Sequence, residues 1–271
     1  MTRTDKMMAQ VAATPYIGTM LSDDEIDRYA RHLVLKEIGG LGQTRLKAAK
    51  VAIVGAGGIG CPAALYLAAA GVGKLGLIDD DTVSLSNLQR QILFATEQVG
   101  AAKAMSAAVT LQGLNPEVDY FPLHVRLDED NAARVLGRYD IVLDGCDNFP
   151  TRLLVNRVCH ELKIPLVSAA IGRWSGQLAV FDGRPCYQCL VPEVPPDADT
   201  CERVGVVGAL AGVMGTLAAL EVIKLITGAG DSLRGQLMLF DGLTMQSRIV
   251  RLTPEPHCPV CGGLEPEGEI V

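Results

Sequence analysis

The sequence lacks several features that mark large classes of proteins. Positive charge is in deficit, because 24 Lys and Arg residues stand against 31 Asp and Glu residues, a formal net charge of −7 at pH 7. This balance argues against a nucleic-acid-binding protein. The N-terminal segment MTRTDKMMAQVAATPY has no apolar core of signal-peptide length, and no internal repeat is present. We therefore expect a cytoplasmic protein without a nucleic-acid partner.

Long hydrophobic runs are also missing. The longest uncharged apolar run, 204–220, has 17 residues and contains four glycines, which is short for a membrane span of roughly 20 residues. It predicts a buried helix and no association with a membrane. The chain has 271 residues, of which 49% are hydrophobic. That suits one large domain or two small ones with an ample core.

The most informative stretch runs from residue 51 to residue 91. An apolar run at 51–54 predicts a buried strand, 61–70 a helix and 75–78 a second strand, with a glycine turn after the first strand. Such a βαβ unit offers phosphates a helix N-terminus and close backbone approach, and ribose an acidic strand end at Asp79. It predicts an adenine-nucleotide site. Gly55, Gly57 and Gly60 also fit the fingerprint of nicotinamide-dependent enzymes, so this stretch alone leaves the nucleotide open.

Polar residues further along the chain point to the same site. The segment 82–91 has little apolar periodicity and contains Arg90. Lys103 falls in the first turn of a helix expected at 101–114, where a cation is unfavourable unless an anion lies nearby; the alternative is a surface lysine. Asp147 and Asn148 follow the strand expected at 139–144, where ligands bind in open α/β sheets. Asp147 suits Mg²⁺, and the alternative is an N-cap for the helix expected at 151–162.

Four of the eight cysteines form two C-x-x-C pairs, Cys186/Cys189 and Cys258/Cys261, with 68 residues between the pairs. Four thiolates make a closed tetrahedral Zn²⁺ site, which here would join two distant segments. A redox role for either pair is the alternative. Cys201 has no such partner and is either a nucleophilic or sulfur-carrying thiol or an unimportant loop cysteine. The three remaining cysteines are expected to be small core residues: Cys61, Cys146 and Cys159.

Together these motifs resemble the MoeB/ThiF/HesA adenylyltransferases, which are bacterial relatives of the ubiquitin-activating enzymes, and most of all the molybdopterin-synthase type. The resemblance covers about residues 21–263, leaving a loose N-terminal tail at 1–20 and an acidic tail at 264–271. It is carried, in order, by RYARHLVL, GAGGIGCP, DDDTVSLSNLQRQ, GAAKA, DGCDNFPTR, PCYQCL and CPVCG.

The resemblance implies an α/β fold with a Rossmann-like nucleotide-binding core. Its mixed, mainly parallel sheet would be extended by antiparallel strands, and the protein would be a homodimer with a Cys₄ zinc site. The implied reaction uses MgATP to adenylate the C-terminal Gly-Gly carboxylate of a small ubiquitin-like sulfur-carrier protein, releasing pyrophosphate. Sulfur then displaces AMP to give a thiocarboxylate. The carrier would be the small subunit of molybdopterin synthase, or a carrier of thiamine synthesis or tRNA thiolation.

Residue roles follow from the same resemblance. Gly58 would lie against the nucleotide, with Gly55, Gly57 and Gly60 shaping the turn, and Asp79 would hold the ribose. Arg90 and Lys103 would neutralise the phosphates, and Arg31 would reach those of the other subunit. Asp147 would bind Mg²⁺, Asn148 would contact the nucleotide and Cys201 matches a loop cysteine that is covalently modified in some members. The remaining phosphate-lining residues would be Ser86, Asn87, Leu88 and Gln89.

Two features depart from the family pattern. Asp80 stands where many relatives have an apolar or aromatic residue, and no rhodanese-like domain follows Cys261. The sulfur donor is therefore expected to be a separate rhodanese or cysteine desulfurase. Two other functions stay open: a NAD-dependent oxidoreductase with a Rossmann core, and a non-catalytic binder of ubiquitin-like proteins.

Overall fold

The computed structural model describes residues 21–193 and 205–262. Its centre is an eight-stranded sheet with the order β3-β2-β1-β4-β5-β6-β7-β8. The five strands from β3 to β5 pair in parallel, and β6, β7 and β8 extend the sheet by antiparallel pairing. This confirms the predicted mixed, mainly parallel sheet. The strands are β1 Lys50–Val54, β2 Lys74–Ile78, β3 Asp119–Leu123, β4 Ile141–Asp144, β5 Leu166–Gly172, β6 Ser175–Phe181, β7 Gln236–Asp241 and β8 Gln246–Arg251.

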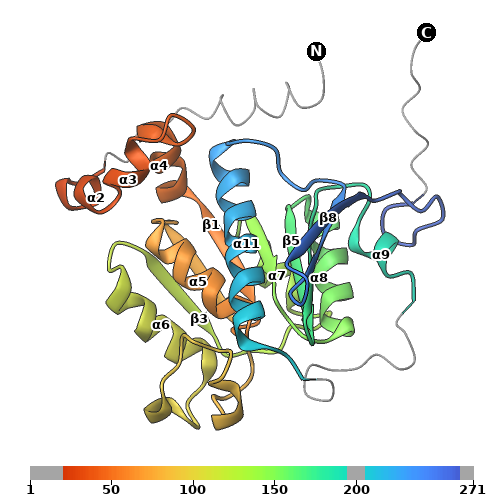
Figure 1. Ribbon diagram of the computed structural model, residues 1–271, viewed down its shortest axis with the longest axis horizontal. Coiled ribbons are helices and arrows are strands. Elements are labelled where there is room, and N and C mark those ends of the chain that lie inside the picture. Colours follow the sequence, from red (N-terminus) through yellow and green to blue (C-terminus); the bar gives the residue numbers. More distant parts are fainter. Residues whose placement is uncertain (1–20, 194–204, 263–271) are drawn as a thin grey trace.

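Helices cover both faces of the sheet (Figure 1), and its central strands β1 and β2 are buried on both faces after their first residue. In β1, Val51 and Ile53 pack into a core with α5, α6 and α11, whereas Ala52 and Val54 face a second core with α7 and α8. The helices are α2 Asp23–Arg28, α3 Ala30–Leu33, α4 Gly39–Ala48, α5 Gly60–Ala69, α6 Lys103–Leu114, α7 Ala132–Leu136, α8 Phe149–Leu162, α9 Tyr187–Leu190 and α11 Gly208–Thr227, with short 3₁₀ turns η1 Leu85–Asn87 and η2 Thr96–Gln98.

The apolar run near residue 204 forms most of α11, a single helix of 20 residues. By length and composition this helix could span a membrane. It packs instead along α5, β5 and β6. Ala211, Met214, Ala218 and Val222 are fully buried there, which agrees with the predicted core helix.

Two close approaches hold the glycine turn between β1 and α5. A Cβ added to Gly60 would lie 1.9 Å from the carbonyl oxygen of Gly55, and one added to Gly215 of α11 would lie 2.3 Å from that of Ile59. Gly55 itself has φ +90°, which L side chains rarely adopt. The turn therefore has its shape because small residues let α5 and α11 pack directly on it.

We expect Gly60→Ala to lower the free energy of unfolding by about 3 kcal/mol or more, since the new methyl group meets backbone that cannot move aside. Gly113→Ala in the last turn of α6 is a matched control, because its Cβ would meet nothing within 4 Å. That change should be neutral or stabilise by about 0.5–1 kcal/mol. Urea unfolding monitored by circular dichroism measures both, and wild-type stability for Gly60→Ala would contradict the close packing.

Candidate nucleotide-binding site

A cavity of about 920 Å³ opens at the carboxyl ends of β1, β2 and β4. Ligands bind at this edge of open α/β sheets because helix N-termini and loops converge there. The structure brings together eight of the predicted site residues in its lining: Gly55, Gly57, Gly58, Asp79, Arg90, Lys103, Asp147 and Asn148. The segments that supply them lie as far apart in the sequence as Gly55 and Asn148, and the parallel pairing of β2, β1 and β4 brings the ends of their strands together.

Other predicted residues lie elsewhere. Gly60 is buried beneath Gly55, and Arg31 is exposed on α3. Cys201 lies outside the described residues. The segment 86–89, which begins in η1 and holds the other phosphate candidates, packs against the start of α11, where a Cβ on Gly208 would lie 2.1 Å from the carbonyl oxygen of Gln89. Four of that segment's residues do not line the cavity: Ser86, Asn87, Leu88 and Gln89.

The carboxylate of Asp79 ties the glycine turn to the end of β2. One oxygen accepts the N–H of Ala56 at 2.8 Å, and the other accepts the N–H of Asp81 at 2.9 Å. Burial raises the pKa of Asp79, while Lys103 and these two N–H groups oppose that change. Each carboxylate oxygen keeps a second lone pair, so Asp79 can still accept a hydrogen bond from a ligand hydroxyl.

Lys103 is buried at the first position of α6, and its Nζ lies 2.8 Å from Asp81. A cation at a helix N-terminus needs a nearby anion. The sequence suggested a phosphate, and the structure places the Asp81 carboxylate there. Asp81 itself lines the cavity and had no assigned role in the sequence. The sequence feature that could have pointed to Asp81 is its place as the third carboxylate of the run Asp79-Asp80-Asp81.

Arg90 is the second cation that we expected at the phosphates, and it lines the same cavity as Lys103. Its Nη1 donates to the carbonyl of Ser86 at 3.2 Å. The aliphatic part of its side chain passes close to Gly58, since a Cβ on that glycine would be 3.5 Å from Cγ and Cδ of Arg90. A methyl group at position 58 would therefore touch Arg90 at ordinary contact distance and would crowd Cβ of Ala211 at 3.2 Å. The glycine keeps the cavity open beside a cation.

Asp147 does not cap the helix that follows it, which corrects one of the two alternatives. The N-cap of α8 is Asn148, whose Oδ1 accepts the N–H of Thr151 at 3.0 Å. The carboxylate of Asp147 is exposed in the cavity and has no hydrogen bond among the described residues. Oxygen donors without protein partners are what Mg²⁺ requires. Cys146 also lines the cavity, whereas Cys61 and Cys159 are core residues as predicted.

The cavity extends beyond the nucleotide residues to the antiparallel strands. Its far wall consists of β6, β7 and β8, with Gln177, Phe240 and Arg248 among the lining residues. Large apolar side chains are exposed in the same region of the sheet: Trp174, Leu243, Met245 and Ile249. No local motif indicated this half, because antiparallel pairing alone brings the three strands together.

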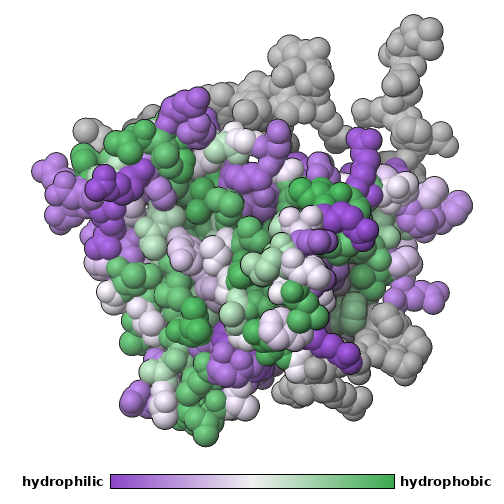
Figure 2. Space-filling view, viewed as in Figure 1, coloured by the Kyte–Doolittle hydropathy of each residue, from purple (hydrophilic) through white to green (hydrophobic). Residues whose placement is uncertain are grey.

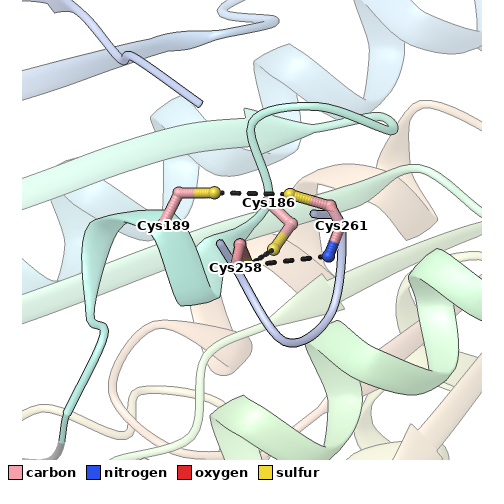
Figure 3. A group of neighbouring side chains, drawn as sticks. All are labelled: Cys186, Cys189, Cys258 and Cys261. Carbon is pink, nitrogen blue, oxygen red and sulfur yellow. Dashed lines mark hydrogen bonds between the residues drawn. The ribbon is translucent and has the colours of Figure 1, made fainter. Parts of the chain in front are cut away.

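The four cysteines of the two C-x-x-C pairs converge, and all their sulfurs lie within 4.8 Å of one another (Figure 3). The short contacts join the two pairs, at 3.6 Å between Cys186 and Cys258 and 3.3 Å between Cys189 and Cys261. Burial alone would raise the pKa of Cys258, but hydrogen bonds from the N–H groups of Cys261 and Val260 and with the thiols of Cys186 and Cys261 together outweigh it and lower the pKa to about 7. A thiolate at such a position is a metal ligand, and the cross-pair arrangement fits one tetrahedral ion better than two separate redox pairs.

Known proteins with similar sequences give an independent comparison. The family model described as "ThiF family" matches residues 29–260. "Sulfur carrier protein adenylyltransferase" of Thermus thermophilus is 45% identical over 257 residues, 92% of this chain and 95% of its own, and "SAMP-activating enzyme E1" of Haloferax volcanii is 45% identical over 246 residues, 89% and 91% of the two chains. "Adenylyltransferase and sulfurtransferase MOCS3" of Mus musculus is 50% identical over 247 residues, but the chain spans only 54% of that relative.

Solved structures agree with this fold. The crystal structure of E. coli MccB matches with a TM-score of 0.76 at 25% identity, covering 91% of this chain and 75% of that one. A relative that matches over nearly its whole length is an adenylyltransferase by name, which confirms the predicted enzyme class. With a family match over most of its length and relatives at 45–50% identity, the chain belongs to the ThiF family.

Proposed function

We propose that the protein transfers AMP from MgATP to the C-terminal Gly-Gly carboxylate of a small ubiquitin-like sulfur-carrier protein. The observation that carries this proposal is one continuous cavity, which joins Arg90 and Lys103 at one end to an open groove over β6–β8 at the other. A nucleotide occupies only the first half. The second half suits an extended tail that brings a carboxylate to the α-phosphate.

In the proposed reaction, a carboxylate oxygen of the tail attacks the α-phosphorus of ATP. The new bond links carboxylate and phosphorus, the bond from the α-phosphorus to the bridging oxygen breaks, and pyrophosphate leaves with the electron pair. Lys103 and Arg90 offset the negative charge that accumulates on the phosphates, and Asp79 orients the ribose. Asp147 would hold Mg²⁺, which when bound would screen the phosphate charge, and Asn148 would contact the nucleotide.

The carrier is recognised outside the nucleotide half in this proposal. Leu243 and Met245 are exposed in the turn between β7 and β8, and the residues on either side of that turn, Asp241 and Gln246, line the groove. An exposed apolar patch next to a groove is typical of a surface that binds a protein partner. Two of the relatives are named for a sulfur carrier and for SAMP activation. Among carriers, the small subunit of molybdopterin synthase is our first choice, ahead of carriers of thiamine synthesis or tRNA thiolation.

A homodimer completes the site in this proposal, with Arg31 entering the cavity of the partner. Arg31 is exposed on α3 and does not line the cavity of its own chain. Apolar side chains gather on the face formed by α5, α6 and α11 (Figure 2), including Tyr66, Val109 and Leu220, which are 51–71% exposed. Covering such a face is the usual role of a second copy.

ATP–pyrophosphate exchange with a Gly-Gly-ending carrier from the same genome tests the reaction. We expect exchange by the wild-type protein and a loss of about 10²-fold or more for Asp147→Ala, because the metal loses its carboxylate. Asp130→Ala removes an exposed carboxylate outside the cavity and should exchange normally. Absence of exchange with every such carrier would refute the proposed adenylation and favour a non-catalytic binder of ubiquitin-like proteins. Wild-type exchange by Asp147→Ala would refute only the assignment of Asp147 as a metal ligand.

Mixed dimers test the role of Arg31. Arg31→Ala and Asp147→Ala should each be inactive alone. Combined by subunit exchange, they should regain about a quarter of wild-type activity, because half of the dimers are mixed and each of these has one complete site. Two affinity tags on the two variants allow the mixed dimer to be purified and assayed. If mixing restores nothing while mixed dimers form, Arg31 does not act across the interface.

We also propose that the four-cysteine cluster holds one Zn²⁺ per chain. Elemental analysis should find about one zinc per chain in the wild type and in Cys201→Ser, and a loss in Cys258→Ser. Strong chelators should lower the melting temperature, since closed sites of this kind contribute on the order of 10 kcal/mol in small systems. A folded, zinc-free wild-type protein would contradict the assignment.

A further inference from the structure

A buried arginine lies in the wall of the cavity and has no part in the reaction described above. Arg152 belongs to the first turn of α8 and is 6% exposed. Its Nη1 lies 3.6 Å from the carboxylate of Asp144, which is 1% exposed at the end of β4. Desolvation lowers the pKa of a buried guanidinium, but Asp144 and neighbouring groups outweigh it here and raise the pKa of Arg152. The group therefore stays charged.

The guanidinium donors are directed at protein acceptors. Nε and Nη2 both donate to the carbonyl oxygen of Cys146, at 3.0 and 2.5 Å. Nη2 also donates to the carbonyl oxygen of Ala169 at 2.7 Å, and Nη1 donates to Oγ of Ser168 at 3.4 Å. With Asp144 as the ionic partner, these contacts use the fork of donors on all three nitrogens. Arg152 is committed to the protein rather than to a ligand.

The carbonyl of Cys146, which accepts two of these hydrogen bonds, belongs to the peptide unit that joins Cys146 to Asp147. A peptide unit is planar, so holding the carbonyl of Cys146 also fixes the amide nitrogen of Asp147. Asp144 holds the other side of Cys146, since one of its oxygens accepts the Cys146 N–H at 3.0 Å and the thiol at 2.6 Å. On the far side of Asp147, Asn148 is fixed as the N-cap of α8.

We propose that Arg152 is a positioning residue that places the Asp147 carboxylate for metal binding. Two N–H groups of one guanidinium grip one carbonyl, which fixes the orientation of that peptide as well as its position. A lysine ammonium is a point charge and cannot reproduce this fork. The inference rests on the proposed role of Asp147 as a Mg²⁺ ligand. A purely structural arginine would support stability but leave metal affinity unchanged.

The test compares Arg152→Lys with wild type in the full-length protein. Mn²⁺ serves as the probe, and its binding in the presence of a non-hydrolysable ATP analogue is followed by electron paramagnetic resonance. We expect the Kd for Mn²⁺ to rise about 10-fold or more, as for other groups that orient a metal ligand. Hydrogen exchange of the 146–148 amides should also accelerate. Nucleotide affinity without metal should change less than about twofold, because Arg152 offers the ligand no donor.

Arg157→Lys is the matched control. It lies on the same helix, but its ionic partners are the exposed Glu129 and Glu161, so Mn²⁺ affinity should stay at the wild-type value. Wild-type Mn²⁺ affinity and amide exchange in Arg152→Lys, with only a lower melting temperature, would overturn the proposal. If that variant does not fold, Ser168→Ala is measured instead. It removes the hydroxyl that lies 3.4 Å from Nη1 of Arg152 and donates to Asp144 at 3.0 Å. An unchanged Kd for Mn²⁺ in Ser168→Ala would then overturn the proposal.

Asp147→Ala distinguishes a failure of the positioning role of Arg152 from a failure of the proposed metal role of Asp147. If Asp147→Ala loses Mn²⁺ binding but Arg152→Lys keeps it, only the positioning role fails. If Asp147→Ala binds Mn²⁺ as the wild type does, the metal assignment fails, and the role of Arg152 fails with it.

Discussion

The hydrogen bond from the Ala56 N–H to the buried carboxylate of Asp79 is the contact on which the cavity depends. It fixes the glycine turn to the end of the neighbouring strand, so the N-terminus of α5 faces the space above β1 and β2. The close packing of Gly60 under Gly55 holds the same turn from below. Because both contacts involve backbone, the wall that faces a nucleotide is rigid before any ligand binds, and little ordering remains to be done on binding.

Charge in the cavity is balanced rather than uniformly positive. Lys103 is already paired with Asp81, and Asp147 adds a carboxylate that has no ion pair within residues 21–193 and 205–262. A triphosphate entering this space would meet carboxylates as well as Arg90 and Lys103, and in the proposed reaction a divalent cation would relieve the repulsion. The metal and the nucleotide are thus expected to bind together. This arrangement distinguishes the site from that of a dinucleotide enzyme, whose pyrophosphate is held mainly by backbone N–H groups and the helix dipole.

Local patterns predicted the parts of this site that local chemistry determines. The apolar strand followed by glycines predicted the turn, and the C-x-x-C spacing predicted the cysteine cluster. The sequence offered Asp147 as a possible N-cap, but Asn148 suits the position equally well. Asn148 has the extended backbone of a cap, φ −130° and ψ 139°, and Pro150 follows at the second helical position. The far wall was not predictable, since β6, β7 and β8 meet through long-range pairing. Arg152 looked like any polar residue of a helix, because its role depends on a carbonyl six residues earlier.

One tyrosine connects the cysteine cluster to the cavity. Tyr187 lies between Cys186 and Cys189, and its N–H donates to Oδ1 of Asn156 on α8 at 2.7 Å. Its ring lies 6.0 Å from the guanidinium of Arg152 and lines the cavity. A metal held by the four sulfurs would fix the backbone on both sides of Tyr187 and, through it, the arginine that grips the Asp147 loop. The distant segment that carries Cys258 and Cys261 would then support the reaction centre without touching a substrate. In that case the metal would act on the cavity through α9 and α8 rather than by taking part in the reaction.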